Sequence, residues 1–585
     1  DSVQWSCTAL SGPNCTAPPS ALLWDLTPEL SSALPGTKDY TLTVAKHGRE
    51  STAAVRVQVV EVPVPEVQII NLERKYSASQ RIMLEGTGTP AVAEYPDLTW
   101  LWSATADGVS LDLAPITTTP LTNKVLVVQA DSLTVGIQYK FKLDAHDGRG
   151  TGSSQADILL NAAPTSGTVS VSPTEGQAVT DTFAIVASGW VDEDLPLLYT
   201  FGYMESAETE VLLSTAASSP SVSAVLPAGA EEDDHDYSVT VSVSDSYAAA
   251  ARRTATVRVR PYEPAASSSM MTDATELLDV AATNDNSEQA TQLVTAFAAS
   301  LNTGNTAADA DAQAEAAEMR SLLATALLNT IADTQGAGDQ EEDEPVEISN
   351  EMVAMLGQSL ASVSAKPDEM TTESLETSFA AVETLTASTT AVVSTAAVES
   401  LAAATSNLCV ATTSFEGEVE NATEAAAFSQ QTVSIVEKLS AALVSNSFVG
   451  EPAVGIATDA FALSSQKNYA AAFEGSPLDS AADTDVGIAV PVGVFDDAPV
   501  GADSAVDVHL TAWAANPFAF ATDPVLPDAE QGEGGIGSAV LSLEFGAEEG
   551  KLELSGLDEP FVLSLTPPAV AWCEKEGAFE SRPLG

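Results

Sequence analysis

Basic residues are scarce in this chain. Its 585 residues include 22 lysines and arginines against 83 aspartates and glutamates, a formal net charge of −61 at pH 7. Binding to nucleic-acid phosphates needs clustered lysine and arginine, so this balance excludes nucleic acid as a partner. An acidic, solvated surface keeps an extracellular or salt-exposed protein soluble, and calcium binding by a subset of the acids is the alternative.

Long apolar runs are also missing. No run of about 18 apolar residues occurs, which excludes a helix spanning a membrane within this sequence. The N-terminus has no initiator Met and lacks the basic start and apolar core of a signal peptide. We therefore expect a mature or excised segment of a longer protein, associated with a membrane only through residues outside this chain.

Cysteine is rare, with four residues in the chain. Cys7 and Cys15 flank a Ser-Gly-Pro-Asn turn, a spacing that predicts a small disulfide loop. Asn14 and Asn421 each begin an N-glycosylation sequon. Together these features predict a secreted or cell-surface protein. Cys409 lies in an apolar helical stretch and is expected to be a buried thiol.

Catalytic motifs are absent too. The sequence has no Gly-x-Ser-x-Gly elbow, no phosphate-binding loop and no His-Glu-x-x-His, and its four histidines are scattered. His509-Leu510-Thr511 matches a self-cleavage triplet, but it lies inside the alternating stretch VDVHLTAW, and a regular strand supplies no strain for such chemistry. We therefore predict a protein that is not an enzyme, with no cofactor other than possible calcium.

Two acidic loops are the candidate calcium ligands. One contains Asp192 and Asp194 and the other contains Asp233 and Asp234. Oxygen-rich loops at the ends of β-sandwiches can hold a hard cation, while solvated turns are the alternative. A third acidic run, from Asp309, resembles the start of an EF-hand but lacks the glycine and glutamate that an EF-hand needs.

One phrase recurs about every 100 residues: YTLTV from Tyr40, YKFKL from Tyr139 and YSVTV from Tyr237. Short alternating segments separated by Pro, Gly and Asp surround each copy, which predicts tandem immunoglobulin-like β-sandwiches. Trp102 and Phe201 are expected to fill their cores. The expected domains are 1–62 (partial), 63–162 and 163–262, joined by proline-bearing linkers.

The composition changes after Pro264. Apolar residues then recur at helical spacing, with Ser349 and Thr372 expected as N-caps, which predicts a bundle of five or six helices over 263–450. Strict alternation returns over Val486–Val494 and in later segments, so 451–585 is expected to be antiparallel β-structure. The predicted fold is multidomain, mainly β with an α-helical block.

The stretch Pro164–Tyr203 resembles a known signature. Its carriers are Pro-x-x-Gly at its start, Ser-Pro-x-Glu-Gly, Thr-Phe, Gly-Trp followed by acids, and Pro-Leu-x-Tyr-x-Phe. This pattern resembles the REJ (receptor for egg jelly) module of polycystin-1-like ectodomains. By this resemblance, 163–262 is a REJ sandwich and 63–162 an immunoglobulin-like or REJ sandwich.

The second half resembles a GAIN domain, the fold beside the autoproteolysis site of adhesion receptors and polycystin-1-like proteins. The carriers are Asn516-Pro-Phe, the strand SAVLSLEF, and Trp572-Cys573. The resemblance implies a helical subdomain A over 263–450 and an antiparallel subdomain B over 451–585. The cysteine-rich proteolysis box would be incomplete at Gly585, which leaves Cys573 without its usual partner.

The resemblance implies a function as well. The chain would be a non-enzymatic segment of a polycystin-1-like protein on the extracellular side of the plasma or ciliary membrane. It would bind extracellular glycoprotein or matrix and associate with a polycystin-2-type cation channel, with a mechanosensory role. The alternative is an acidic secreted or surface-layer structural or adhesion protein without a signalling partner; a self-cleaving module would need residues beyond Gly585.

Overall fold

The computed structural model describes residues 2–11, 36–46, 49–59, 63–92, 97–206, 209–264, 269–304, 310–336, 348–388, 393–414, 422–479, 486–514, 540–547, 550–554 and 560–565. The chain forms two compact units. One comprises Asp1–Tyr76 and Arg81–Leu160, and the other comprises Ser77–Gln80 and Asn161–Gly585. Among the described residues, no helix has the length and apolarity needed to cross a membrane.

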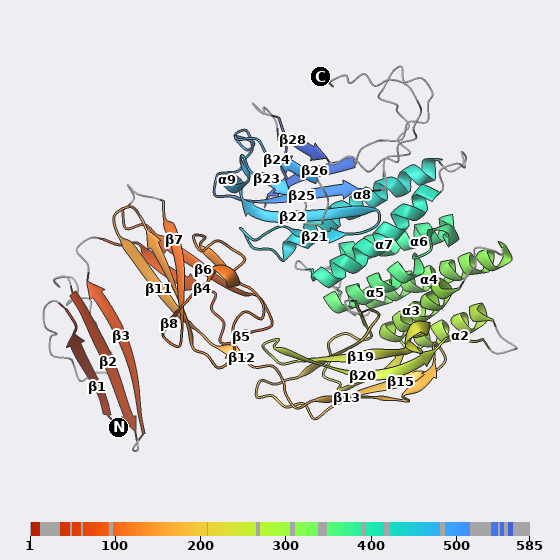
Figure 1. The fold of residues 1–585 in the computed structure, drawn as a ribbon, viewed down its shortest axis with the longest axis horizontal. Helices are drawn as coiled ribbons and strands as arrows, with labels where there is room; N and C mark the ends of the chain where they lie inside the picture. Colours follow the sequence, from red (N-terminus) through yellow and green to blue (C-terminus); the bar gives the residue numbers. More distant parts are fainter. Residues whose placement is uncertain are drawn as a thin grey trace. The chain divides into compact units, whose positions relative to one another are not determined.

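The first unit begins with an antiparallel three-stranded sheet of order β1-β2-β3, formed by β1 (Ser2–Ala9), β2 (Gly36–Lys46) and β3 (Arg49–Val59). The rest of this unit contains a sandwich of two sheets (Figure 1). One sheet has the order β4-β6-β9, with β4 (Glu66–Ile70), β6 (Ile82–Thr89) and β9 (Val125–Val128). The other has the order β11-β10-β7-β8, with β7 (Thr99–Ala106), β8 (Val109–Leu111), β10 (Tyr139–His146) and β11 (Thr151–Ile158).

Alternation explains why these segments form a sandwich. Along β10, every second side chain from Tyr139 to Ala145 is buried. Leu143 lies opposite Trp102 on β7, and Trp102, Leu84 and Leu126 are buried as well. A single turn of 3-10 helix, η1 (Ala114–Ile116), precedes β9, and the two-residue strands β5 (Tyr76–Ser77) and β12 (Leu160–Asn161) lie where the division between the units falls.

The second unit begins with a sandwich of two sheets. The first sheet has the order β13-β15-β18, with β13 (Thr168–Ser172), β15 (Thr182–Ser188) and β18 (Ser221–Val225). The second has the order β14-β20-β19-β16-β17, with β14 (Glu175–Gln177), β16 (Leu198–Met204), β17 (Glu210–Leu212), β19 (Asp236–Ser244) and β20 (Ala250–Arg260). A 3-10 turn, η2 (Glu231–Asp233), leads into β19. Phe183, Phe201 and Val241 are buried between the sheets.

The repeated tyrosines hold loops of their own sandwiches. The Tyr139 hydroxyl accepts a hydrogen bond from the Thr134 amide at 3.0 Å, and the Tyr237 hydroxyl donates to the Pro227 carbonyl at 3.0 Å. This is the tyrosine-corner arrangement, in which a strand tyrosine bonds to backbone upstream of it. For Tyr139 and Tyr237, the recurring phrase therefore marks the same structural feature in two sandwiches.

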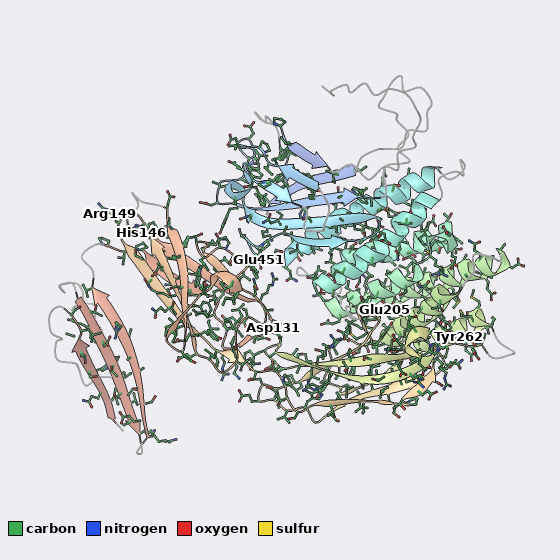
Figure 2. All side chains as sticks on the ribbon, viewed as in Figure 1. Asp131, His146, Arg149, Glu205, Tyr262 and Glu451 are labelled. Carbon is green, nitrogen blue, oxygen red and sulfur yellow. The ribbon has the colours of Figure 1, made fainter. Side chains whose placement is uncertain are left out.

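A buried aspartate ends two of the tyrosine-led strands. The Asp147 carboxylate accepts hydrogen bonds from the backbone amides of Ala91, Arg149 and Gly150, and these bonds lower its pKa. Figure 2 labels Arg149 in this turn. Asp245 has the corresponding position in the second unit, accepting from the Tyr247 and Ala249 amides and from Asn161 Nδ2.

Seven α-helices follow between Met270 and Ser445 in the described part of the chain, against the five or six predicted. They are α2 (Met270–Thr283), α3 (Ser287–Thr303), α4 (Ala310–Gly336), α5 (Asn350–Val363), α6 (Thr372–Ala387), α7 (Thr395–Ser414) and α8 (Ala422–Ser445), with a 3-10 turn η3 (Pro367–Glu369) between α5 and α6. Ser349 caps α5 as predicted. The predicted cap Thr372 is wrong by one residue, because the Thr371 hydroxyl accepts from the Ser374 amide.

Strands return after α8. A five-stranded antiparallel sheet has the order β21-β22-β25-β26-β27, with β21 (Val454–Ala457), β22 (Phe461–Tyr469), β25 (Ala505–Trp513), β26 (Val540–Ala547) and β27 (Gly550–Lys551). A smaller sheet has the order β23-β24-β28, with β23 (Pro477–Asp479), β24 (Val486–Ala489) and β28 (Val562–Leu565). The short helix α9 (Ala470–Phe473) follows β22.

The strand predicted over Val486–Val494 is shorter than expected, because β24 ends at Ala489. Pro491 has no amide hydrogen to continue the pairing, and turns replace the strand from there, with Val492 exposed. The broader prediction, a multidomain and mainly β chain with a helical block, is confirmed. The predicted domain limits stay predictions.

One apolar core runs through the second unit. It includes Phe183 and Phe201 in the sandwich, Phe297 and Phe379 in the helices, and Trp513 in β25. The helices lie between the sandwich and the five-stranded sheet (Figure 1). Because these elements share buried side chains, separating any one of them would expose apolar surface of its neighbours.

Candidate functional site at the junction of the sandwich and the helices

The contact between the second-unit sandwich and the helices is a polar arrangement that joins distant segments of this unit. We call it the sandwich–helix junction and define it by Tyr262, Asp273, Glu288, Gln292 and Gln358. These five side chains come from the end of the sandwich and from α2, α3 and α5. They connect residues 67 to 148 positions apart in the sequence, apart from the local pair Tyr262–Asp273.

Gln292 bridges both sheets of the sandwich. Its side-chain oxygen accepts from the Val225 amide at 3.0 Å, and its Nε2 donates to the Leu213 carbonyl at 2.7 Å. Val225 ends β18 in one sheet, and Leu213 directly follows β17 in the other. Gln292 is 4% exposed, so both hydrogen bonds are shielded from water. One helix side chain thus ties together the open edges of the two sheets.

Gln358 and Glu288 extend this connection. Gln358 Oε1 accepts from the Leu212 amide at 3.3 Å and its Nε2 donates to the Glu210 carbonyl at 2.9 Å, as a neighbouring strand would on the free edge of β17. Glu288 Oε1 accepts from the amide and the hydroxyl of Thr215, at 2.7 and 2.8 Å. Three helical side chains therefore satisfy backbone groups that the sandwich leaves unpaired.

Tyr262 fixes the passage from β20 into α2. It is buried, its ring meets Phe297 edge-on at 5.8 Å, and its hydroxyl donates to Asp273. Burial is the main cause that raises the pKa of Tyr262. Figure 2 labels this residue where the sandwich meets the helices. The predicted proline-bearing linker packs against the helices at this point, since Tyr262 lies in the shared core.

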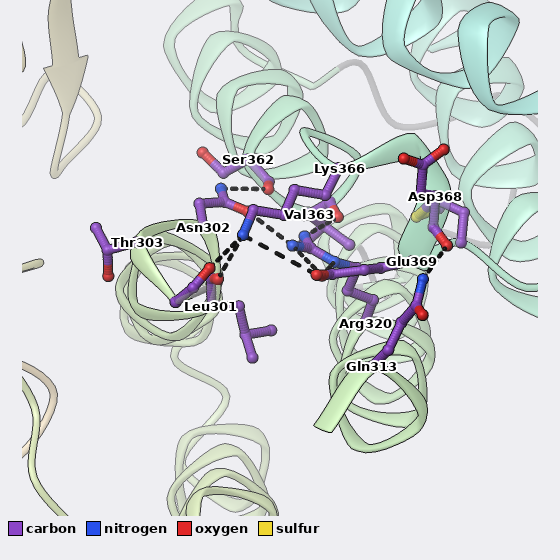
Figure 3. Close-up of polar contacts among 12 residues, drawn as sticks. Leu301, Asn302, Thr303, Gln313, Arg320, Ser362, Val363, Lys366, Asp368 and Glu369 are labelled. Carbon is purple, nitrogen blue, oxygen red and sulfur yellow. Dashed lines mark hydrogen bonds and ion pairs between the residues drawn. The ribbon is translucent and has the colours of Figure 1, made fainter. Parts of the chain in front are cut away.

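A buried-charge network lies farther along the helices (Figure 3). Arg320 is 0% exposed and Glu369 is 4% exposed. The Arg320 guanidinium donates to Glu369 Oε2 at 2.9 Å, to the Val363 carbonyl at 2.6 Å and to Asn302 Oδ1 at 2.8 Å. Burial lowers the pKa of Arg320, while the Glu369 carboxylate opposes this shift. Each of the three guanidinium nitrogens therefore has a hydrogen-bond acceptor.

Lys366 joins the same network. Its Nζ donates to the Gly304 carbonyl at 2.6 Å and lies 4.0 Å from Glu369 Oε1. Arg320 and Lys366 thus hold carbonyls at the C-terminal ends of α5 and α3, where helices lack internal partners and carry partial negative charge. The arrangement stabilises the crossing of α3, α4, α5 and η3, and it brings no reactive groups together.

The triplet His509-Leu510-Thr511, which matches a self-cleavage sequence, lies in β25, and this strand pairs with β22 on one side and with β26 on the other. His509 Nδ1 is 3.0 Å from the Ser465 hydroxyl, which itself donates to the Ser440 carbonyl of α8, so Nδ1 carries the proton. Burial lowers the pKa of His509. The triplet occupies regular, doubly paired strand, as the sequence predicted.

The four candidate calcium ligands fall in two places. Asp192 Oδ1 accepts from the Asp194 amide at 2.8 Å, and Asp234 forms an ion pair with Arg258 at 2.8 Å. The first loop reaches Ser246, beyond the end of β19, whereas Asp233 and Asp234 precede its start. A strand of nine residues separates them by about 27 Å, so they cannot share an ion.

Among the described residues, no group of three or more His, Cys, Asp and Glu side chains is arranged to hold a metal. Calcium binding stays a prediction. Cys7 is disulfide-bonded, and its predicted partner Cys15 lies outside the described residues, so that pairing also stays a prediction. The glycosylation candidates Asn14 and Asn421, and Cys573, lie outside the described residues as well. Cys409 is a buried thiol, whose pKa burial raises to about 11.

The signature stretch has structural roles. A Cβ on Gly167 would lie 1.9 Å from ring carbons of Trp190, so the glycine allows the indole to pack flat on the backbone. The amides and carbonyls of Thr165 and Val191 bond to each other at 3.0 Å beside this contact. Arg253 covers the indole at 5.7 Å from its centre. Pro-x-x-Gly and Gly-Trp are therefore two halves of one packing unit.

Sequence reasoning missed the junction glutamines and the buried-charge network. Gln292 and Gln358 lie in α3 and α5, and the residues next to them in the sequence give no sign that they will contact the edges of sheets. Arg320 offered one signal. It is one of three basic residues in 263–450, amid 29 acids, and it occupies a buried helical position.

Comparison with known proteins gives one family. A family model described as REJ domain matches residues 32–296, which ends inside α3. Solved structures that resemble parts of the chain include fibronectin(III)-like modules of Clostridium thermocellum CbhA, with 12% identity over 35% of this chain and 100% of that chain, at a TM-score of 0.21.

Two others are the FN1–FN3 domains of chicken CNTN1 and a titin fragment. The first is 16% identical over 44% of this chain and 91% of that chain, at a TM-score of 0.21. The second, titin I67–I69 in an E-to-A variant, is 13% identical over 39% of this chain and 75% of that chain, at a TM-score of 0.16. Likenesses at these scores support no conclusion about function. The chain carries a REJ module, an extracellular type of domain.

Proposed function

We propose that this chain is a non-enzymatic extracellular segment of a polycystin-1-like cell-surface protein, in which the second-unit sandwich and the helical block act as one rigid body. The observation that carries the proposal is the extent of the REJ match. It does not end with the last sandwich strand at Arg260 but continues through α2 into α3, the helices that share the sandwich core.

We further propose that the helices and the two final sheets form a GAIN-like domain. A helical block followed by antiparallel sheets fits the helical subdomain A and the β subdomain B of such a domain. In that case the junction joins a REJ sandwich directly to the domain next to an autoproteolysis site. A load on the sandwich would then reach the GAIN-like sheets through packed side chains.

The partners follow from the same proposal. The segment would bind extracellular glycoprotein or matrix, and the full-length protein would associate with a polycystin-2-type channel at the plasma or ciliary membrane. A rigid connection suits a mechanosensory role, because a flexible one would absorb displacement before it reached the channel. The scarcity of enzymatic motifs and the architectural roles of the signature residues support a binding and load-bearing function.

Co-precipitation tests this function. The full-length protein would be expressed at the surface of ciliated cells with a tagged polycystin-2-type subunit, and the subunit would be captured after mild detergent extraction. We expect recovery of the protein with the channel, and none with an unrelated six-helix potassium channel. Equal recovery with both channels, or none with either, would favour the alternative of a structural adhesion protein without a signalling partner.

A further inference from the structure

A groove lies between α2 and α4, beside the start of α3. We call it the acidic groove. Its volume is about 700 Å³, and its apolar floor is formed by Leu278, Ala281, Ala290, Leu322 and Ala326. Clefts of about 300–1,000 Å³ are the usual size of ligand sites. The lining runs along α4 from Leu322 to Gly336, which at 1.5 Å per residue is about 21 Å.

Small side chains keep the groove open. The lining from α2 and α4 includes Ala282, Thr325 and Ala326, whose small side chains fill less of the space between the helices than leucines would. Leu322 and Ala326 are consequently only half-buried. Apolar surface is left accessible to a partner, and the length of the lining along α4 favours a peptide segment over a small molecule.

The rim of the groove is negatively charged. Asp279, Asp285 and Asp333 line it and are exposed, and none of them forms an ion pair with a lysine or arginine in the described part of the chain. The surroundings offer little compensation, since 263–450 has 29 acids and three bases, of which Arg320 and Lys366 are held in the buried-charge network. The potential over the groove therefore favours a cation.

We infer that the acidic groove is a docking site for a basic amphipathic helix of a partner protein. Apolar side chains of that helix would lie on the alanine and leucine floor, and its lysines or arginines would face the three aspartates. An amphipathic helix laid in a groove is a recurring mode of peptide recognition, with anchors at i, i+3 or i+4 and i+7. The inference goes beyond the proposed function, and either can fail without the other.

The test uses the whole chain and a synthetic probe. The probe is a fluorescein-labelled 14-residue peptide, Ac-LKKLLKLLKKLLKL-NH2, and binding is followed by fluorescence anisotropy at 50 and 300 mM NaCl. The control peptide has the same composition in an order that spreads leucine around the helix. We expect the amphipathic peptide to bind at least tenfold more tightly than its control and to weaken as salt rises, because salt screens exposed charge pairs.

Variants separate the groove from general attraction to an acidic surface. The test variant replaces the three groove aspartates, Asp279→Asn/Asp285→Asn/Asp333→Asn, and should weaken binding about tenfold or more. The control variant makes the same change in net charge at exposed positions outside the groove, Glu276→Gln/Glu376→Gln/Glu437→Gln, and should weaken binding less. Ala326→Leu narrows the groove without changing charge and should also weaken binding. Equal loss in the two triple variants, equal affinity for the two peptides, or unchanged binding by Ala326→Leu would each overturn the inference.

Discussion

Replacing Gln292 with leucine is the sharpest test of the sandwich–helix junction. The substitution nearly preserves side-chain volume but removes the acceptor for the Val225 amide and the donor to the Leu213 carbonyl. Both residues are buried, at 4% and 2% exposure, so water cannot replace these bonds without opening the structure. A buried backbone group left without a partner costs about 1–3 kcal/mol.

The two losses together amount to about 2–6 kcal/mol, and the more apolar leucine offsets part of this through burial. We expect a net cost of about 3 kcal/mol, which corresponds to a factor of about 100 in a local opening equilibrium. Hydrogen exchange followed by mass spectrometry measures this directly. Peptides covering β17 and β18 should exchange about 100-fold faster, while peptides from β10 in the first unit should not change.

Gln430→Leu is the matched control, because Gln430 is exposed on α8. The interpretation of the junction is refuted if Gln292→Leu leaves exchange in β17 and β18 as slow as it is in this control. Uniformly faster exchange throughout the second unit would instead mean that the glutamine supports the whole core rather than the sheet edges.

Three further outcomes are expected. Arg320→Met leaves the Glu369 carboxylate buried without its main partner and should cost about 3–5 kcal/mol in urea unfolding, with Arg320→Met/Glu369→Met regaining much of the loss; an unchanged single variant would contradict a buried ion pair. Gly167→Ala forces its Cβ against Trp190 and should cost about 1–3 kcal/mol with a red shift in tryptophan emission, which a wild-type spectrum would disprove. Burial lowers the pKa of His509 in the folded chain, so below the ordinary histidine pKa of 6.5 the unfolded chain binds a proton more readily than the folded chain does. The free energy of unfolding should therefore fall as the pH drops from 7 to 5. His509→Gln should flatten that dependence, and a pH profile identical to that of the wild type would count against the burial of His509.

The sequence predicted the sandwiches well, because alternation and turn residues act locally. Tyr139 and Tyr237 mark equivalent strands, and their hydroxyls bond to backbone only five and ten residues upstream. A pattern that depends on nearby residues can be found from nearby residues. The end of β24 at Ala489 could also have been foreseen, since Pro491 follows it.

The junction could not be foreseen in the same way. Gln358 bonds to Glu210 and Leu212, and 146–148 residues separate them, so their meeting depends on how whole elements pack. Tyr262 lies in the predicted proline-bearing linker, yet the ring that it contacts, Phe297, lies on α3. The aromatic ring of Tyr262, between the two prolines, was the signal that this segment would be buried, because large aromatic side chains are seldom left fully exposed to water.

Single-molecule pulling of the whole chain measures the rigid connection most directly. If the second-unit sandwich, the helices and the five-stranded sheet form one body, residues 161–551 should unfold in one event that releases about 1,330 Å of chain, at about 3.4 Å per residue. A separate event of about 350 Å at lower force, the length of residues 161–262 alone, would show that the sandwich unfolds by itself and would contradict its rigid connection to the helices and the five-stranded sheet.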